Sequence, residues 1–250
     1  MNEVNWSKFS PERGYEDKDI QDYDRKVRDF LGEKGSIEYI VGPKIDGLAV
    51  ELVYKKGELS LASTARNPTR GGYVTSNIKT LLTVPLTLIQ LDADCSIPDL
   101  LTVQGDVYME VKDFQTLNHN RIKKGKHPFA NPVDATADSL RQPNPRITAR
   151  RPLNMFCSGI GDYVGPTFET RMESMVMLQK WGHRVNRPFL KECHMVNKVI
   201  QYCHHLQEIR AQFPYQIDGA FIEPNRLTHL AKLGAEKGNP GSVFALKFKS

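Results

Sequence analysis

Apolar side chains recur at helical spacing near the start of the chain. One apolar face is formed by Ile20, Tyr23, Val27, Phe30 and Leu31. This spacing predicts a helix that Gly32 ends, and Asp17 lies in its first turn, where the helix dipole favours an acidic side chain. The residues before the helix are predicted to be extended. Residues 1–35 are therefore expected to form an N-terminal arm and helix.

The apolar period changes to two after Ser36, which is typical of β-strands. Residues 37–41 are predicted to form a short strand and residues 48–55 a longer one. Residues 56–57 then make a turn into a further alternating segment, so a β-hairpin is expected. This interpretation places Lys44 between a short strand and a long one.

The rest of the chain changes repeatedly between strand-like and helix-like segments. Further strands are predicted at residues 102–109, 155–160, 215–222 and 242–248. Helices or compact segments are predicted at residues 76–82, 111–118, 130–141, 168–176 and 196–209. Loops are predicted at residues 64–72, which are polar, and 121–127, which are basic. No internal repeat is visible, so the fold class is α+β, with antiparallel sheets flanked by helices in one main domain, residues 36–250.

Length and composition set limits on this fold. The chain has 250 residues, of which 40% are hydrophobic and 25% charged, which is enough for one large core or two modest ones. No apolar run is long enough to cross a bilayer, and the N-terminus carries no secretory signal, so a cytoplasmic location without a membrane partner is expected. The net charge of +5 is compatible with a phosphate-rich partner, although many soluble proteins carry a similar charge.

Four cysteines are present, and no two of them have the Cys-x-x-Cys spacing of a zinc site. Cys203, which two histidines follow, offers a metal-binding alternative together with Cys193. The stronger interpretation is structural. Cys203 falls on the apolar stripe of residues 196–209, where a free cysteine behaves as a small hydrophobic side chain.

The run from Pro43 to Gly47 carries the most specific chemistry. A lysine amine attacks phosphorus only in its neutral form, and the ordinary pKa of lysine is about 10.4, so a nucleophilic lysine needs nearby cations or desolvation. The glycine allows the backbone to approach a nucleotide closely. Taken alone, the run Lys44-Ile45-Asp46-Gly47 is more compatible with a solvent-facing lysine at a strand end.

Several separated segments give this run a context. They are residues 22–28, 39–50, 103–109, 129–132 with 139–142, 214–219 and 244–248. In this order they resemble the adenylation domain of NAD-dependent DNA ligases, including its nucleophile strand, its Ala-rich signature and its last two motifs. The resemblance covers nearly the whole chain. It implies a ligase-type nucleotidyltransferase fold, which is similar to ATP-grasp folds.

The resemblance also implies a chemistry. Lys44 would attack the α-phosphorus of NAD to form a lysyl-AMP phosphoramide, Asp46 would position the lysine, and Lys247 would neutralise the α-phosphate and favour the neutral amine. The nucleotide would also be bound by Gly47, Arg66, Asp106, Arg141, Arg210 and Asp218. Phosphoryl transfer depends on positioning and charge neutralisation, so Mg²⁺ is the expected metal ion. The expected partner is nicked double-stranded DNA, bound by a monomer.

Several positions depart from the family, and they lie in the expected site. Gly42 replaces the glutamate that reads the adenine, Ser158 replaces an aromatic residue that stacks on the base, and Glu223 replaces a lysine. Val133 replaces an arginine of the Ala-rich signature, and Arg66 matches the family arginine only after a one-residue slip. Each lost cation would weaken phosphate binding by roughly 1.5–3 kcal/mol, the usual size of a charge-assisted hydrogen bond.

Other modules of the family have no counterpart in the sequence. No room precedes Trp6 for the small domain that captures the nicotinamide mononucleotide half of NAD, and the sequence ends just after Lys247, where the family continues into an OB-fold, a zinc finger and helix-hairpin-helix repeats. Either the sequence is a fragment of a longer protein or the gene encodes a minimal one, and full nick sealing by this chain alone is not expected.

Three functions are compatible with these observations. The favoured one is an active adenylyltransferase domain of a divergent DNA ligase, because the expected site residues are retained, namely Lys44, Asp46, Arg141, Arg210 and Lys247. The second is a non-catalytic module that binds nucleic acid or a partner, which the altered site favours. The third is an enzyme that uses another nucleotide or acceptor. The basic residues 121–127 suit phosphate contacts in the first two.

Overall fold

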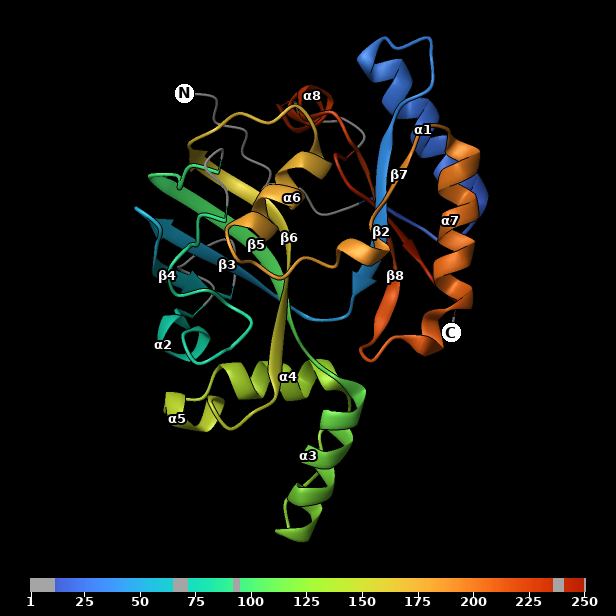
Figure 1. Cartoon of the computed structure of the whole chain (residues 1–250). Coiled ribbons are helices and arrows are strands. Elements are labelled where there is room, and N and C mark those ends of the chain that lie inside the picture. Colours follow the sequence, from blue (N-terminus) through green and yellow to red (C-terminus); the bar gives the residue numbers. More distant parts are fainter. Residues whose placement is uncertain (1–11, 65–71, 92–94, 236–240, 250) are drawn as a thin grey trace.

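The strands of this chain form two β-sheets (Figure 1). The computed structural model describes residues 12–64, 72–91, 95–235 and 241–249. In the first sheet the strands are, in spatial order, β1 (Glu12–Gly14), β9 (Phe244–Lys247), β8 (Ile217–Pro224), β2 (Tyr39–Ile45) and β7 (Lys191–Cys193). In the second they are β4 (Glu58–Ser63), β3 (Leu48–Lys55), β5 (Leu100–Met109) and β6 (Leu153–Val164). In the part of the chain that the structure describes, neighbouring strands are antiparallel except β1 with β9, so the predicted α+β class with antiparallel sheets is confirmed.

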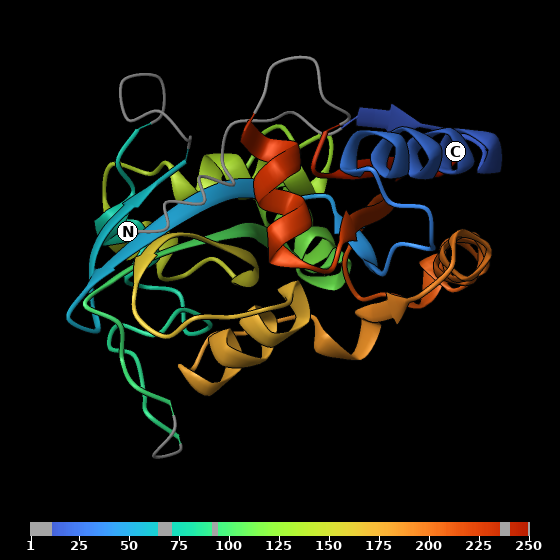
Figure 2. The same cartoon turned by 90° about the horizontal axis from the view of Figure 1, so that it is seen from above.

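The helices divide between the two sheets. Those that pack with the first sheet are α1 (Asp17–Leu31), α7 (Val196–Glu208) and α8 (Leu227–Ala235). Those that pack with the second are α2 (Thr75–Ile78), α4 (Pro132–Leu140) and α6 (Arg171–Lys180), and the short α5 (Pro145–Thr148) packs against α2 and α4. Seen from above, α1 and α7 lie at the opposite end of the molecule from β3 and β4 (Figure 2). Among the described residues, no helix has the length and apolar character that a membrane span requires.

Each sheet has its own hydrophobic core. Leu52, Val103 and Trp181 are fully buried in the core of the second sheet. In the core of the first sheet, the Tyr23 ring of α1 packs against the Phe244 ring of β9, with centroids 5.0 Å apart. The first helix and the first sheet therefore share one core.

The predicted first helix and the predicted hairpin are both confirmed. At the start of α1 the Asp19 carboxylate accepts a hydrogen bond from the backbone N–H of Glu16 (3.0 Å), which satisfies a donor that the helix leaves unpaired. At its end Gly32 has a φ of 70°, a left-handed conformation that glycine adopts without strain. Lys56 and Gly57 also have positive φ values and join β3 to β4.

The predicted position of Lys44 outside the strands is wrong, because this residue lies inside β2. A proline in the run makes a strand difficult to predict, since proline cannot donate to a sheet. Here Pro43 is tolerated because β7 pairs with β2 only from Tyr39 to Val41, so Pro43 has a strand neighbour on one side only. Residues 46–47 then cross from β2 to β3 in the other sheet.

The predicted basic loop is wrong in its first part, because it contains the last turn of α3 (Val111–Lys123). The Arg121 side chain donates a hydrogen bond to the carbonyl of His127 (2.8 Å), and its guanidinium lies over the Phe129 ring. These contacts fold the following loop back onto the helix end. Helix α3 extends away from both sheets at the bottom of Figure 1. Two short 3-10 helices, η1 (Arg187–Phe189) and η2 (Arg210–Gln212), complete the fold.

Candidate nucleotide site

One carboxylate joins two lysines at the end of the first sheet. Asp218 on β8 has its oxygens 3.1 and 3.2 Å from the Nζ of Lys44 on β2, and it also accepts a hydrogen bond from Lys247 on β9. The three strands are adjacent, so the sheet brings together side chains that are far apart in the sequence. About a quarter to a third of each side chain is exposed (31% for Lys44, 27% for Asp218 and 23% for Lys247), so a ligand has access to both amines.

Asp46 belongs to the same electrostatic neighbourhood. Burial raises the pKa of its carboxyl group, and the negative charge of Asp218 raises it further. The positive charges of Lys44, Lys247 and Arg210 act in the opposite direction. An ionised Asp46 is therefore disfavoured by its surroundings, although three cations are close enough to stabilise it in part.

Gly47 has a packing reason to be glycine. A Cβ atom at this position would lie 2.7 Å from the carbonyl oxygen of Val107 and 3.1 Å from the Cβ of Asp106, and the first of these distances is too short for any real contact. Both neighbours belong to β5, so Gly47 allows the crossing segment to lie directly against that strand. Asp106 itself lines the same cavity as Lys44.

The three arginines expected to bind the nucleotide differ in their placement. The Nε of Arg210 donates to the carbonyl of Ile217 (3.1 Å) at the start of β8, close enough for its charge to act on Asp46. Arg141 follows α4 with an exposed side chain and is not among the residues that line the cavity. Arg66 lies outside the described residues. Of the two described arginines, Arg210 is therefore the one beside the lysines.

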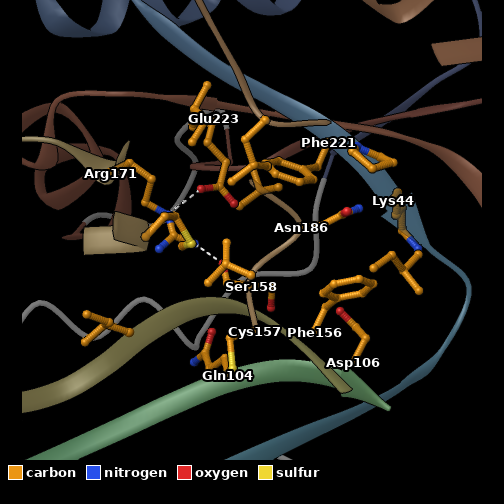
Figure 3. A pocket seen from close by; sticks show the side chains of 18 of the residues that line it. Lys44, Gln104, Asp106, Phe156, Cys157, Ser158, Arg171, Asn186, Phe221 and Glu223 are labelled. Carbon is orange, nitrogen blue, oxygen red and sulfur yellow. Dashed lines mark hydrogen bonds and ion pairs between the residues drawn. The ribbon is translucent and has the colours of Figure 1, made fainter. Parts of the chain in front are cut away.

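A cavity lies between the two sheets and begins beside Lys44 (Figure 3). The first sheet contributes Lys44, Phe221 and Glu223, and the second contributes Asp106 and Phe156. The remaining wall is largely apolar. A polar edge at one end and an apolar interior are the usual properties of a small-molecule site.

An ion pair crosses the cavity at some distance from Lys44. The Nε of Arg171 lies 2.8 Å from an Oε atom of Glu223, and each side chain is only 12% exposed. Arg171 also donates to the carbonyl of Ser158 (Figure 3). Gly159 makes room for it, since a Cβ atom there would lie 2.8 Å from an Nη atom of Arg171. The sequence identified Glu223 as a charge reversal but gave no signal for Arg171.

Cys157 lines the cavity and contacts a buried histidine, His183. The Sγ of Cys157 is 3.4 Å from the Nδ1 of His183. Burial raises the pKa of the Cys157 thiol and lowers the pKa of His183 to about 3. Both groups are therefore neutral near pH 7 and act as packing residues. Cys203 is buried in α7, as its position on the helix stripe predicted.

The chain has two mainly antiparallel sheets with a cavity between them, and Lys44 on β2 lies at the edge of that cavity. These features define a ligase-type nucleotidyltransferase fold. The model of the family "NAD-dependent DNA ligase adenylation domain" matches residues 3–250, so this chain belongs to that family. The resemblance found in the sequence motifs is thereby confirmed.

Individual relatives agree with this assignment. A DNA ligase of Syntrophus aciditrophicus (strain SB) is 39% identical over 234 residues, which are 94% of this chain and 34% of that protein. A DNA ligase of Geobacter sulfurreducens is 39% identical over 243 residues, 96% of this chain and 35% of that protein. The chain thus spans about a third of the length of these relatives. Among solved structures, a Naegleria gruberi RNA ligase with PPi gives a TM-score of 0.44 at 11% identity, over 97% of this chain and 56% of that chain.

Proposed function

We propose that this chain is the adenylyltransferase domain of a divergent DNA ligase, in which Lys44 accepts AMP from NAD. The observation that carries the proposal is the cluster of Lys44, Asp218 and Lys247 at the edge of the cavity. It provides a nucleophile, a proton acceptor and a second cation within one hydrogen-bonded group. The family assignment supplies NAD as the donor.

The proposed reaction begins with the proton of Lys44. Asp218 lies 3.1 Å from its Nζ and is close enough to accept that proton. The neutral amine attacks the α-phosphorus of NAD, a nitrogen–phosphorus bond forms, and the nitrogen releases its second proton to water. The bond from this phosphorus to the bridging oxygen breaks, and nicotinamide mononucleotide leaves with the electron pair on that oxygen. Lys247 shares the carboxylate of Asp218, so it is near enough to stabilise negative charge on the phosphate oxygens.

The neighbouring residues are proposed to hold the nucleotide in position. Asp46 adjoins both lysines and would orient Lys44 and contact the ribose. Arg210 adds positive charge at the same end of β8, and Asp106 faces the cavity from the second sheet. Gly47 keeps the connecting segment close to β5. Arg141 is proposed to contact the substrate from the end of α4, with its exposed side chain.

Mg²⁺ is proposed as the metal ion, bound together with the donor. The described residues contain no group of three or more His, Cys, Asp or Glu side chains that could hold a metal ion by themselves. Mg²⁺ ordinarily keeps several water ligands and is bound by one or two carboxylates plus the phosphates of a substrate.

The test is the formation of a covalent adduct. We expect NAD labelled in its adenylate half, with Mg²⁺, to leave an acid-labile AMP on the protein. Lys44→Arg should abolish the adduct because a guanidinium is not nucleophilic, whereas Lys55→Arg, at the exposed end of β3, should retain it. An adduct that persists in the Lys44→Arg variant would show that another residue is the nucleophile. The absence of any adduct from the unaltered chain with NAD, ATP or GTP would refute adenylyl transfer.

The acceptor is proposed to be nicked double-stranded DNA, bound by a monomer. Exposed lysines at and beyond the end of α3, among them Lys123, Lys124 and Lys126, are suited to backbone phosphates. Replacing all three with alanine should weaken duplex binding and reduce its salt dependence, which a gel-shift titration over a range of salt concentrations measures. Nicked duplex bound by a chain that forms no adduct would favour the second candidate, a non-catalytic binding module.

A further inference from the structure

The cavity face of β8 differs from what the family pattern requires. Strand β2 pairs with β8 so that Lys44 lies opposite Gly219, Gly42 opposite Phe221 and Ile40 opposite Glu223. Alternate residues of a strand share one face, so Phe221 and Glu223 follow each other along the cavity as it leads away from Lys44. Figure 3 shows both side chains beside each other at the cavity wall.

Phe221 takes the space that the missing side chain of Gly42 leaves. A Cβ atom on Gly42 would lie 2.7 Å from the Phe221 ring and 2.6 Å from a methyl group of Leu190. A glutamate at this position is therefore incompatible with the observed ring. The observed position of the Phe221 ring therefore requires that position 42 carry no side chain.

Glu223 is held in a fixed position. Its ion pair with Arg171 uses one carboxylate oxygen, and Arg171 is itself fixed by the carbonyl of Ser158 and by the room that Gly159 leaves. The backbone N–H of Arg171 donates to the carbonyl of Asn225 on the β8 side (2.6 Å). An anchored and largely buried carboxylate is a preorganised hydrogen-bond acceptor.

We infer that β8 has taken over recognition of the adenine base, with Phe221 packing against its ring and Glu223 accepting a hydrogen bond from its 6-amino group. The two residues replace the aromatic residue lost at Ser158 and the glutamate lost at Gly42. The inference rests on the proposed function, which supplies adenine as the base. The spacing along the strands is on the scale of a nucleotide. Ile40, which pairs with Glu223, lies four residues from Lys44 along β2, and this separation is about 13 Å at the rise of a strand.

The first experiment compares two ligands on the unaltered chain by titration calorimetry. One is AMP, and the other is purine riboside 5′-monophosphate, which lacks the 6-amino group. AMP should bind at least about tenfold more tightly, as expected for one hydrogen bond to a charged acceptor. Equal affinities, or no measurable binding of AMP, would overturn the inference. Because this comparison needs no variant, misfolding cannot hide a negative result.

Variants then assign the preference to β8. Glu223→Gln should reduce the preference for AMP to about threefold or less, whereas Glu58→Gln on the exposed end of β4 should leave it unchanged. Phe221→Leu should lower the affinity of both ligands about equally, by roughly tenfold or more, because stacking on the ring does not depend on the amino group. If the Glu223→Gln variant keeps the full preference for AMP, the 6-amino group does not contact Glu223 and the inference is wrong.

The result separates this inference from the proposed function. An adduct on Lys44, together with a preference for AMP that is unchanged in the Glu223→Gln variant, would refute the inference and support the proposed function. A preference for AMP that depends on Glu223, without any adduct, would support the inference as a nucleotide-binding site and refute the transfer reaction.

Discussion

The ion pair between Arg171 and Glu223 offers a direct test of how this cavity is built. We consider Arg171→Met, Glu223→Leu and the double variant, which replace the charged groups with apolar side chains of similar length. The side chains belong to α6 and β8, so the pair links the helix of the second sheet to the central part of the first.

The geometry of the ion pair sets the expected size of its effect on the free energy of unfolding. At the observed 2.8 Å, and with an effective dielectric constant of about 20, the attraction is about 6 kcal/mol. Both groups are 12% exposed, so each also loses several kcal/mol of hydration, and the net value of the pair is small. Removing one partner leaves the other charge buried and should cost about 3 kcal/mol in the free energy of unfolding. The double variant should cost no more than either single variant, which gives a coupling energy of about 3 kcal/mol.

Urea unfolding followed by the fluorescence of the buried Trp181 measures these free energies. The matched control is the pair of Arg25 and Asp22, whose side chains are 65% and 35% exposed and whose coupling should be below about 1 kcal/mol. Single effects of Arg171 and Glu223 that add within about 0.5 kcal/mol in the double variant would refute the description of a buried, coupled pair.

Three further changes test other parts of the site. Asp46→Asn should raise the melting temperature at pH 7, because the fold raises the pKa of this carboxyl and so disfavours its ionised form. The gain in melting temperature should vanish as the pH falls below the ordinary pKa of 3.8. A gain that does not depend on pH would contradict this explanation. Gly47→Ala should destabilise the chain by about 1–3 kcal/mol in urea unfolding, because its methyl group meets the Val107 carbonyl. His183 should make the chain less stable as the pH falls from 6.5 toward 3, since its pKa is about 3 in the fold, and His183→Gln should remove this slope in thermal scans.

The parts of the fold that the sequence predicted correctly depend on local signals. Helix α1 has its apolar stripe and both of its ends within one short segment, and the hairpin of β3 and β4 has its turn between its own strands. Strand β2 was misplaced because its tolerance of Pro43 depends on where β7 stops, and β7 lies about 150 residues further along the chain. Nothing near Pro43 in the sequence carries that information.

The candidate site likewise has residues that the sequence identified and residues that depend on contacts between distant segments. The resemblance identified Lys44, Asp218 and Lys247 as separate motif residues, and the sheet order explains why they meet on one carboxylate. Whether they carry out adenylyl transfer stays a prediction. Arg171 could not be found from the sequence, because its partner Glu223 is 52 residues away and an arginine in the first turn of a helix is common on protein surfaces.

The substitutions in the cavity have a different meaning once the strand pairing is known. By the family resemblance alone, Gly42 marks an expected base contact that is absent, and Glu223 marks an unexpected negative charge. In the ladder of β2 and β8, Phe221 fills the space opposite Gly42, and Glu223 lies one step further along the same face, neutralised by Arg171. A carboxylate this far buried is costly without a partner, and the ion pair with Arg171 offsets that cost. The paired arrangement therefore supports the proposal that this cavity binds a base, and the affinity of AMP for the Glu223→Gln variant tests that proposal.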